Sequence, residues 1–277
     1  MSAGSIFYSA PPTGDQRIHI NPALITITDG RYGHQPEADL QYEVHHQVMT
    51  LVAHGVRTFH VDVIFPDYGA FATDGPDVNT AIFTPIWFNT LARDLIPFNA
   101  YLNVHLLTDD PLRHVGDYAR AAGAVCFQLD GIADDAELAS IIDTIRGAGA
   151  CASPVIETQG TSSRPAAAPD VVAARLYPYL DQIGMLTLQA AATGARADQP
   201  GTVLATELVR AYLSPLRTGF NGTIQLQGGI TVATIPQAVQ LGGHFLVVGS
   251  QLFRNRNGYT PQQIIDAMLN AARRISA

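Results

Sequence analysis

Two histidines and an aspartate lie in two short segments that are rich in β-forming residues. His60 and Asp62 are two residues apart in TFHVDVIF (58–65), which puts them on one side of a strand, and His105 lies in AYLNVHLL (100–107). Two imidazoles and one carboxylate suit zinc, manganese, iron or cobalt, whereas calcium and magnesium prefer more oxygen ligands. A lone buried histidine is more often a core residue bonded to a carboxylate, but this group of three favours a divalent metal site.

The elements that must position these residues alternate between strand-like and helical runs, a pattern typical of βα units in a parallel sheet. Threonine or aspartate followed by proline predicts helix starts at Thr84 and Asp110, and residues 260–263 form a capping box. Four glycines are expected as left-handed helix ends: Gly55, Gly123, Gly147 and Gly242. The predicted strands are 22–27, 58–63, 100–107, 124–130, 151–157, 182–189, 223–229 and 244–250.

Eight such repeats without a break in composition predict an α/β fold of the (β/α)8 TIM barrel type. An open doubly wound sheet is the alternative, but no G-x-G-x-x-G follows the first strand. We expect an N-terminal extension at 1–17 and one barrel domain at 18–277. The two cysteines, Cys126 and Cys151, fall in apolar strands without metal-binding spacing, so reduced core thiols are expected.

The composition narrows the set of partners. The chain has 277 residues and a net charge of −8, only 14% of its residues are charged, and it contains no basic run. Such a chain would repel phosphate backbones and anionic lipids, so neither nucleic acid nor a membrane is an expected partner. No stretch of 18 apolar residues and no leader pattern is present, so a cytoplasmic protein is expected. The low charge content favours a homo-oligomer.

Further polar residues fall on the side of their strands that His60 and Asp62 predict to face the barrel interior. Most of them stand near the carboxyl ends of the strands, where the active sites of such barrels lie. Buried polar groups need hydrogen-bond partners, a ligand or a metal. The set comprises Asn103, Gln128, Asp130, Glu157, Thr187, Gln189, Gln225 and Gln227.

Three of these segments resemble the ribulose-phosphate 3-epimerase family. HVDV (60–63) is similar to its His-x-Asp motif, NVHLLTDDP (103–111) to its third-strand histidine, and 224–253 to its last two strands. The resemblance extends from about Pro22 onward. It implies a ribulose-phosphate-binding barrel and metal-dependent inversion of a ketopentose phosphate carbon, and family members commonly form oligomers.

The resemblance also implies roles for individual residues. His60, Asp62 and His105 would be metal ligands, and Asp62 would also act as an acid and base. Glycine-rich turns after the last two strands would hold a substrate phosphate by their backbone amides. The residues at those positions are Gly228, Gly229, Gly249 and Ser250.

The chain departs from the family pattern at the position of its second aspartate, which is both a fourth ligand and the second acid/base. Gln227 stands there. An amide can coordinate a metal through its oxygen but cannot carry a proton at neutral pH. Inversion through an enediolate calls for two titratable groups, so one of the pair is missing.

The chain also departs from the family pattern at the end of the first strand, where Ala23 replaces a serine.

Other carboxylates could supply the missing proton. Glu157 ends the fifth strand, where the family would have lysine, and we expect it to face the substrate across from Asp62; the alternative is a pair with Arg164. Further candidates are Asp130, Asp67 and Asp29. Arg196, in a segment that replaces a glycine-rich turn, would add a positive charge for phosphate.

The leading functional prediction is a divergent metal-dependent epimerase or isomerase of a ketose or ketose phosphate, acting through a metal-stabilised enediolate. One remaining carboxylate favours a one-base aldose–ketose isomerisation. A metal-dependent lyase, hydrolase or oxygenase on the same barrel is an alternative. A non-catalytic relative that binds a small molecule is another.

Overall fold

A computed structural model of the chain describes residues 17–28, 34–69, 79–160, 164–191, 204–254 and 258–276. Its strands are β1 (His19–Pro22), β2 (Thr58–Ile64), β3 (Tyr101–Leu107), β4 (Ala124–Gln128), β5 (Cys151–Glu157), β6 (Met185–Gln189), β7 (Thr223–Gln227) and β8 (Phe245–Val248). They pair in parallel in the order β1-β8-β7-β6-β5-β4-β3-β2. The sheet closes where Ala23 bridges to His60 and the Leu24 amide donates to the His60 carbonyl at 2.8 Å. The predicted TIM barrel is confirmed.

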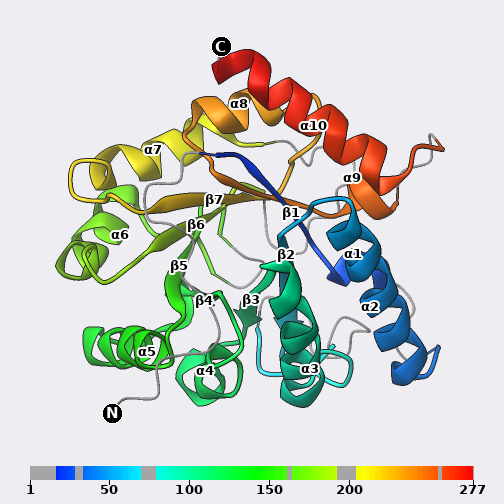
Figure 1. Cartoon of the computed structure of the whole chain (residues 1–277). Helices are drawn as coiled ribbons and strands as arrows, with labels where there is room; N and C mark the ends of the chain where they lie inside the picture. The colour runs from blue at the N-terminus through cyan, green and yellow to red at the C-terminus, as the bar shows by residue number, and fades with distance from the viewer. Residues whose placement is uncertain are drawn as a thin grey trace.

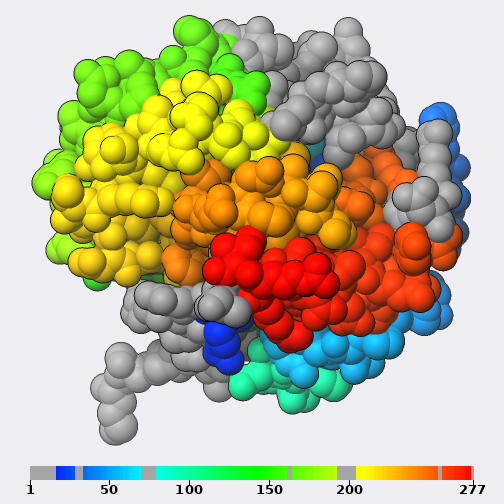
Figure 2. Space-filling model, turned by 90° about the horizontal axis from the view of Figure 1, so that it is seen from above, coloured from blue at the N-terminus to red at the C-terminus, as the bar shows by residue number. Residues whose placement is uncertain are grey.

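The helices surround the strands (Figure 1). They are α1 (Ile25–Thr28), α2 (Glu37–Ala53), α3 (Pro85–Leu95), α4 (Pro111–Ala119), α5 (Asp135–Gly147), α6 (Pro169–Leu176), α7 (Thr206–Leu216), α8 (Ile235–Gln240), α9 (Ser250–Phe253) and α10 (Pro261–Ser276), with 3-10 turns η1 (Ile96–Phe98), η2 (Leu129–Gly131) and η3 (Tyr177–Tyr179). Figure 2 shows α7, α8 and α10 side by side on one outer face. Among the described residues, no helix combines the length and apolarity that a membrane crossing requires.

The predicted helix starts are confirmed by their side-chain caps. The Thr84 hydroxyl accepts the Trp87 amide at 3.2 Å, and Asp110 Oδ1 accepts the Arg113 amide at 3.2 Å. In the capping box, Thr260 and Gln263 exchange two such bonds, at 2.8 and 3.3 Å. Each cap satisfies amides that would otherwise have no partner in the first turn of the helix.

The predicted range of the first strand, 22–27, is wrong. The strand β1 lies earlier in the sequence, at His19–Pro22. The Ala23 amide donates to the carbonyl of Val248, the last residue of β8, so the pairing partner ends there. The chain then turns into α1, where the Thr26 hydroxyl bonds back to the Ala23 carbonyl at 2.6 Å. The β-branched residues of 22–27 favour a strand, but β8, the strand that would pair with them, ends at Val248.

The glycine prediction is confirmed at two of four positions. Gly55 and Gly242 have φ values of 93° and 80°, but Gly147 lies inside α5 and Gly149, with φ 88°, takes the left-handed position. Gly123 has another role, because a Cβ there would lie 2.5 Å from a ring carbon of Tyr101. Close packing against that ring accounts for this glycine.

The strand starts form an apolar plug inside the barrel, composed of Tyr101, Ala124, Cys151, Met185 and Phe245. Each of these side chains is at most 8% exposed. His19 stacks on Phe245 with a ring-centroid distance of 4.8 Å and extends the plug. Both cysteines are buried and free, as predicted.

Candidate metal centre

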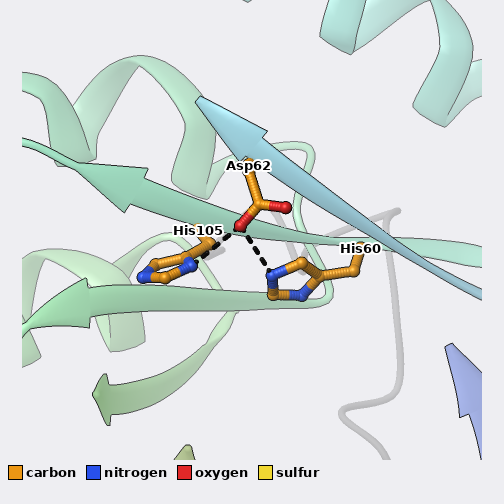
Figure 3. A group of neighbouring side chains, drawn as sticks. All are labelled: His60, Asp62 and His105. Carbon is orange, nitrogen blue, oxygen red and sulfur yellow. Dashed lines mark hydrogen bonds and ion pairs between the residues drawn. The ribbon is translucent and has the colours of Figure 1, made fainter. Parts of the chain in front are cut away.

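Strands β2 and β3 bring the three predicted ligands together. Asp62 and His105 are paired positions of the two strands, and His60 precedes Asp62 by two residues on the same side. His60, Asp62 and His105 are 0%, 4% and 1% exposed, and both imidazole rings face the carboxylate (Figure 3). The predicted cluster therefore exists in the folded chain.

One carboxylate oxygen is the centre of this group. Asp62 Oδ1 lies 3.1 Å from His60 Nε2 and 3.0 Å from His105 Nδ1. Gln227, at the end of β7, donates its Nε2 to the same oxygen at 3.2 Å. Asp62 Oδ2 points away from both imidazole rings (Figure 3). The candidate ligand atoms of the two histidines and the aspartate all lie within 4.8 Å of one another.

The surroundings of Asp62 and His105 favour the protonation states in which a carboxylate and an imidazole bind a metal. Burial by itself raises the pKa of Asp62, but the charges and hydrogen bonds of His60 and His105 outweigh it and hold that pKa well below its usual range. Burial lowers the pKa of His105, and its hydrogen bond to Asp62 only partly offsets this. An ionised carboxylate beside a neutral imidazole is the form that metal binding requires.

The donor set fits a divalent transition metal. Two imidazole nitrogens and a carboxylate oxygen leave open coordination positions for a fourth ligand or a substrate. Gln227 Oε1 is buried and has no hydrogen-bond partner among the described residues, so rotation of the amide would turn an oxygen toward the same point. Gln227 is the residue that the sequence suggested as a fourth ligand.

Asn79 and Tyr68 belong to the site and were missed in the sequence. Asn79 Nδ2 donates to the Asp62 carbonyl at 2.8 Å, and its Oδ1 accepts the Ile64 amide at 2.8 Å, which holds the end of β2. Tyr68 Oη accepts from Gln128 Nε2 at 2.9 Å. Both lie in the long connection between β2 and α3, which carries no regular pattern, so a polar side chain in an irregular segment was the only signal.

Glu157 lies at the end of β5 and is 6% exposed. Gln128 Nε2 donates to Glu157 Oε1 at 3.0 Å, as well as to Tyr68. Glu157 therefore belongs to a second polar group at the mouth, which is linked to the connection after β2 through Tyr68. Its part in the reaction remains a prediction.

The other predicted carboxylates lie nearby with partners of their own. Arg164 pairs with Asp109 at 2.9 Å and approaches Asp130 at 4.0 Å. Burial raises the pKa of Asp130, and Arg164 only partly offsets it. Asp67 accepts the Thr108 hydroxyl at 2.9 Å. Asp29 and Arg196 lie outside the described residues.

Comparison with known proteins adds an independent line of evidence. The model of the ribulose-phosphate 3 epimerase family matches residues 38–253, which is most of the chain. The chain belongs to this family. Among curated members, the ribulose-phosphate 3-epimerase of Treponema pallidum (strain Nichols) is 26% identical over 207 residues, which cover 73% of this chain and 82% of that protein. The Candida glabrata enzyme of the same name is 24% identical over 176 residues, 63% of each chain.

Solved structures support the architecture of this epimerase-family chain. The 3-hexulose-6-phosphate synthase of Salmonella typhimurium matches with a TM-score of 0.60 at 15% identity, over 93% of this chain and all of that one. A Mycobacterium tuberculosis tryptophan synthase matches with a TM-score of 0.61 at 15% identity, over 96% of this chain and 99% of that one. At such identities the likeness shows the barrel fold and no more.

The glycines that the family resemblance singled out follow the neighbouring strands β7 and β8. Gly228 and Gly229 both have positive φ, 94° and 69°, and a Cβ on Gly228 would lie 2.8 Å from the Ala191 amide nitrogen. A Cβ on Gly249 would lie 2.6 Å from Thr26 Cγ2. Ser250 begins α9. Backbone conformation and close packing thus require glycine here, and phosphate binding remains a prediction.

Proposed function

We propose that the chain is a divergent metal-dependent epimerase or isomerase of a ketose or ketose phosphate, in which a proton moves through an enediolate. The observation that carries the proposal is the convergence of His60, His105 and Gln227 on one oxygen of Asp62, in a chain of an epimerase family. A divalent ion held there would polarise the substrate carbonyl and stabilise negative charge on the enediolate.

Asp62 has two oxygens in different surroundings, which supports a double role. The contacts of His60, His105 and Gln227 all go to Oδ1. Oδ2 points away from the histidines and would take the proton from the substrate carbon (Figure 3). Since the histidines hold the pKa of Asp62 low, the carboxylate is ionised at neutral pH, the state in which Oδ2 can accept a proton.

The second proton position distinguishes two versions of the reaction. Gln227 cannot carry a proton, so inversion would require another acid on the opposite face of the substrate. We assign that role to Glu157, which Gln128 holds at the mouth. In a one-base version, Asp62 alone would move a proton along one face of the substrate, as in aldose–ketose isomerisation.

The substrate would lie over the ends of β7 and β8. Backbone amides at Gly228, Gly229, Gly249 and Ser250 would hold a phosphate group, and Arg196 would add a positive charge. The two positive φ values after β7 support a turn of this kind. The same barrel mouth would hold the ketose carbons above Asp62.

Deuterium exchange tests the proposal directly. The protein, loaded in turn with zinc, manganese, iron or cobalt, is incubated in D2O with ketopentoses, ketohexoses and their phosphates, and solvent deuterium at the sugar carbons is followed by NMR. Exchange that a chelator abolishes supports the proposal. Loss of inversion in Glu157→Gln with retained exchange at one carbon would identify the two-base version; an unaffected Glu157→Gln favours the one-base version. Absence of exchange with every sugar and metal contradicts the proposal.

A further inference from the structure

A layer of polar side chains fills the barrel interior between the metal centre and the apolar plug. All of its members are completely buried: Asn21, Asn103, Cys126, Ser153, Thr187 and Gln225. The interior of such barrels is more often filled by branched apolar side chains. Burying amides and hydroxyls costs free energy unless they bond to one another, so these side chains need hydrogen-bond partners within the layer.

Gln225 is the hub of the layer and sets the direction of two amides. Its Oε1 accepts Asn21 Nδ2 at 3.0 Å and Asn103 Nδ2 at 3.5 Å. Its Nε2 donates to Thr187 Oγ1 at 3.1 Å and to Cys126 Sγ at 3.4 Å. Because Gln225 holds the nitrogens of both asparagines, their carbonyl oxygens are directed elsewhere.

His60 lies between the two asparagines in the order of strands. Asn21 is on β1, His60 on β2 and Asn103 on β3, and Asn103 is the register partner of His60. His60 Nδ1, Asn21 Oδ1 and Asn103 Oδ1 are all buried and have no hydrogen-bond partner among the described residues. One possible donor therefore lies between two acceptors that need one.

We propose that Asn103, oriented by Gln225, accepts the Nδ1 proton of His60, directly or through one water molecule, and thereby holds His60 Nε2 as the metal-binding atom. The inference rests on the metal centre of the proposed function. A hydrogen-bond acceptor behind a metal-binding imidazole fixes which of its nitrogens carries the proton. In the metal-free protein His60 Nε2 can donate to Asp62 Oδ1 at 3.1 Å, and a bound metal would displace that proton; the metal-binding imidazole then carries its proton on Nδ1, where Asn103 accepts it. Asn103 is a positioning residue in this scheme, with Asn21 in support.

Metal affinity gives the first test. Zinc binding is measured by competition with a chromophoric chelator for the parent protein, Asn103→Leu, Asn103→Asp and Ser153→Ala. Asn103→Leu removes the acceptor and should weaken zinc binding about 10- to 100-fold. Asn103→Asp loses the Nδ2 donor to Gln225 but keeps an acceptor oxygen for His60, so its zinc affinity should not fall below the parent value. Ser153→Ala is the matched control, since Ser153 is equally buried in the layer but bonds Thr187 at 2.8 Å on the far side from His60.

The Nδ1 proton of the zinc-bound imidazole gives the second test. Long-range 15N–1H spectra of the zinc-loaded protein, assigned with His60→Gln, should show a His60 Nδ1 proton that exchanges slowly with solvent in the parent and in Asn103→Asp. In zinc-loaded Asn103→Leu this proton has lost its acceptor and should exchange faster. A folded Asn103→Leu protein with parental zinc affinity and unchanged exchange of the Nδ1 proton would overturn the inference while leaving the metal centre intact. A parent protein that binds no divalent metal would refute the metal centre and this inference together.

Discussion

The two ends of the barrel interior are built from the same strands and have opposite character. At the strand starts, Tyr101 and Phe245 pack with other apolar side chains into the plug. Four residues after Tyr101 on the same strand, His105 faces Asp62, and the ends of the other strands contribute Gln128, Glu157 and Gln227. Side chains of alternate residues point inward, so one register supplies both ends. The strand starts therefore form a packed core, whereas the strand ends form the candidate site. Substitutions at the two ends should have separable effects on the free energy of unfolding and on activity.

The largest expected effect is at the mouth. In the proposed mechanism, Asp62→Asn removes the proton carrier and a metal ligand together, so turnover should fall about 10⁴-fold, at the upper end of what one acid–base group contributes. Steady-state kinetics on a substrate identified by deuterium exchange measure this. Asp94→Asn on α3, where the carboxylate pairs with His45 at 3.1 Å far from the mouth, is the control and should keep parental turnover. Equal losses in both variants would break the comparison.

The plug should give the opposite result. Phe245 is 1% exposed, and Phe245→Ala leaves a cavity that should lower the free energy of unfolding by about 3 to 5 kcal/mol. Urea unfolding measures the change, and zinc competition on the folded variant should give parental affinity. A strong loss of zinc affinity would show that the two ends are coupled.

Removing the metal should lower the Tm through the ligands at the mouth, and substitutions in the plug should leave this effect unchanged. At a free metal concentration 100 times its dissociation constant, binding to the folded state contributes about 2.7 kcal/mol, which a chelator removes. Thermal unfolding with and without chelator measures this in the parent protein. His105→Ala should abolish the difference, whereas Met185→Ala in the plug should keep it despite a lower Tm.

The smallest effect is expected at Asp130, on the rim of the mouth. Burial raises the pKa of this carboxyl, so the folded state disfavours its charge at pH 7, and Asp130→Asn should raise the Tm slightly. As the pH falls through the raised pKa toward 3.8, the parent residue becomes protonated and its disadvantage disappears. The Tm values of the two proteins should therefore converge in acid. A Tm that falls on substitution at pH 7 would show that the pair with Arg164 dominates.

The sequence predicted what depends on local pattern. The alternation of strands and helices, the caps at Thr84 and Asp110, and the His60–Asp62–His105 cluster all follow from residue type and spacing, and the structure has them. The first strand was misplaced because its extent depends on where β8 ends, which is a property of the partner strand and not of residues 22–27.

The remaining features depend on contacts between distant residues. The hydrogen bond from Gln227 to Asp62 joins residues 165 positions apart in the sequence. The bond from Asn79 to the Asp62 carbonyl comes from a connection without regular periodicity. The hub role of Gln225 needs the register of β1, β3 and β7 together. No single window of sequence contains that information.

The join between β1 and β2 has a further consequence. This seam consists of the Ala23–His60 bridge and the Leu24 amide bond to the His60 carbonyl, a shorter ladder than the seven paired positions of β2 and β3. His60, whose backbone closes the barrel at this seam, is thus also a proposed metal ligand. A bound metal that immobilises the His60 imidazole should therefore also hold this seam closed, and slower hydrogen exchange at the Leu24 amide on metal binding would report it.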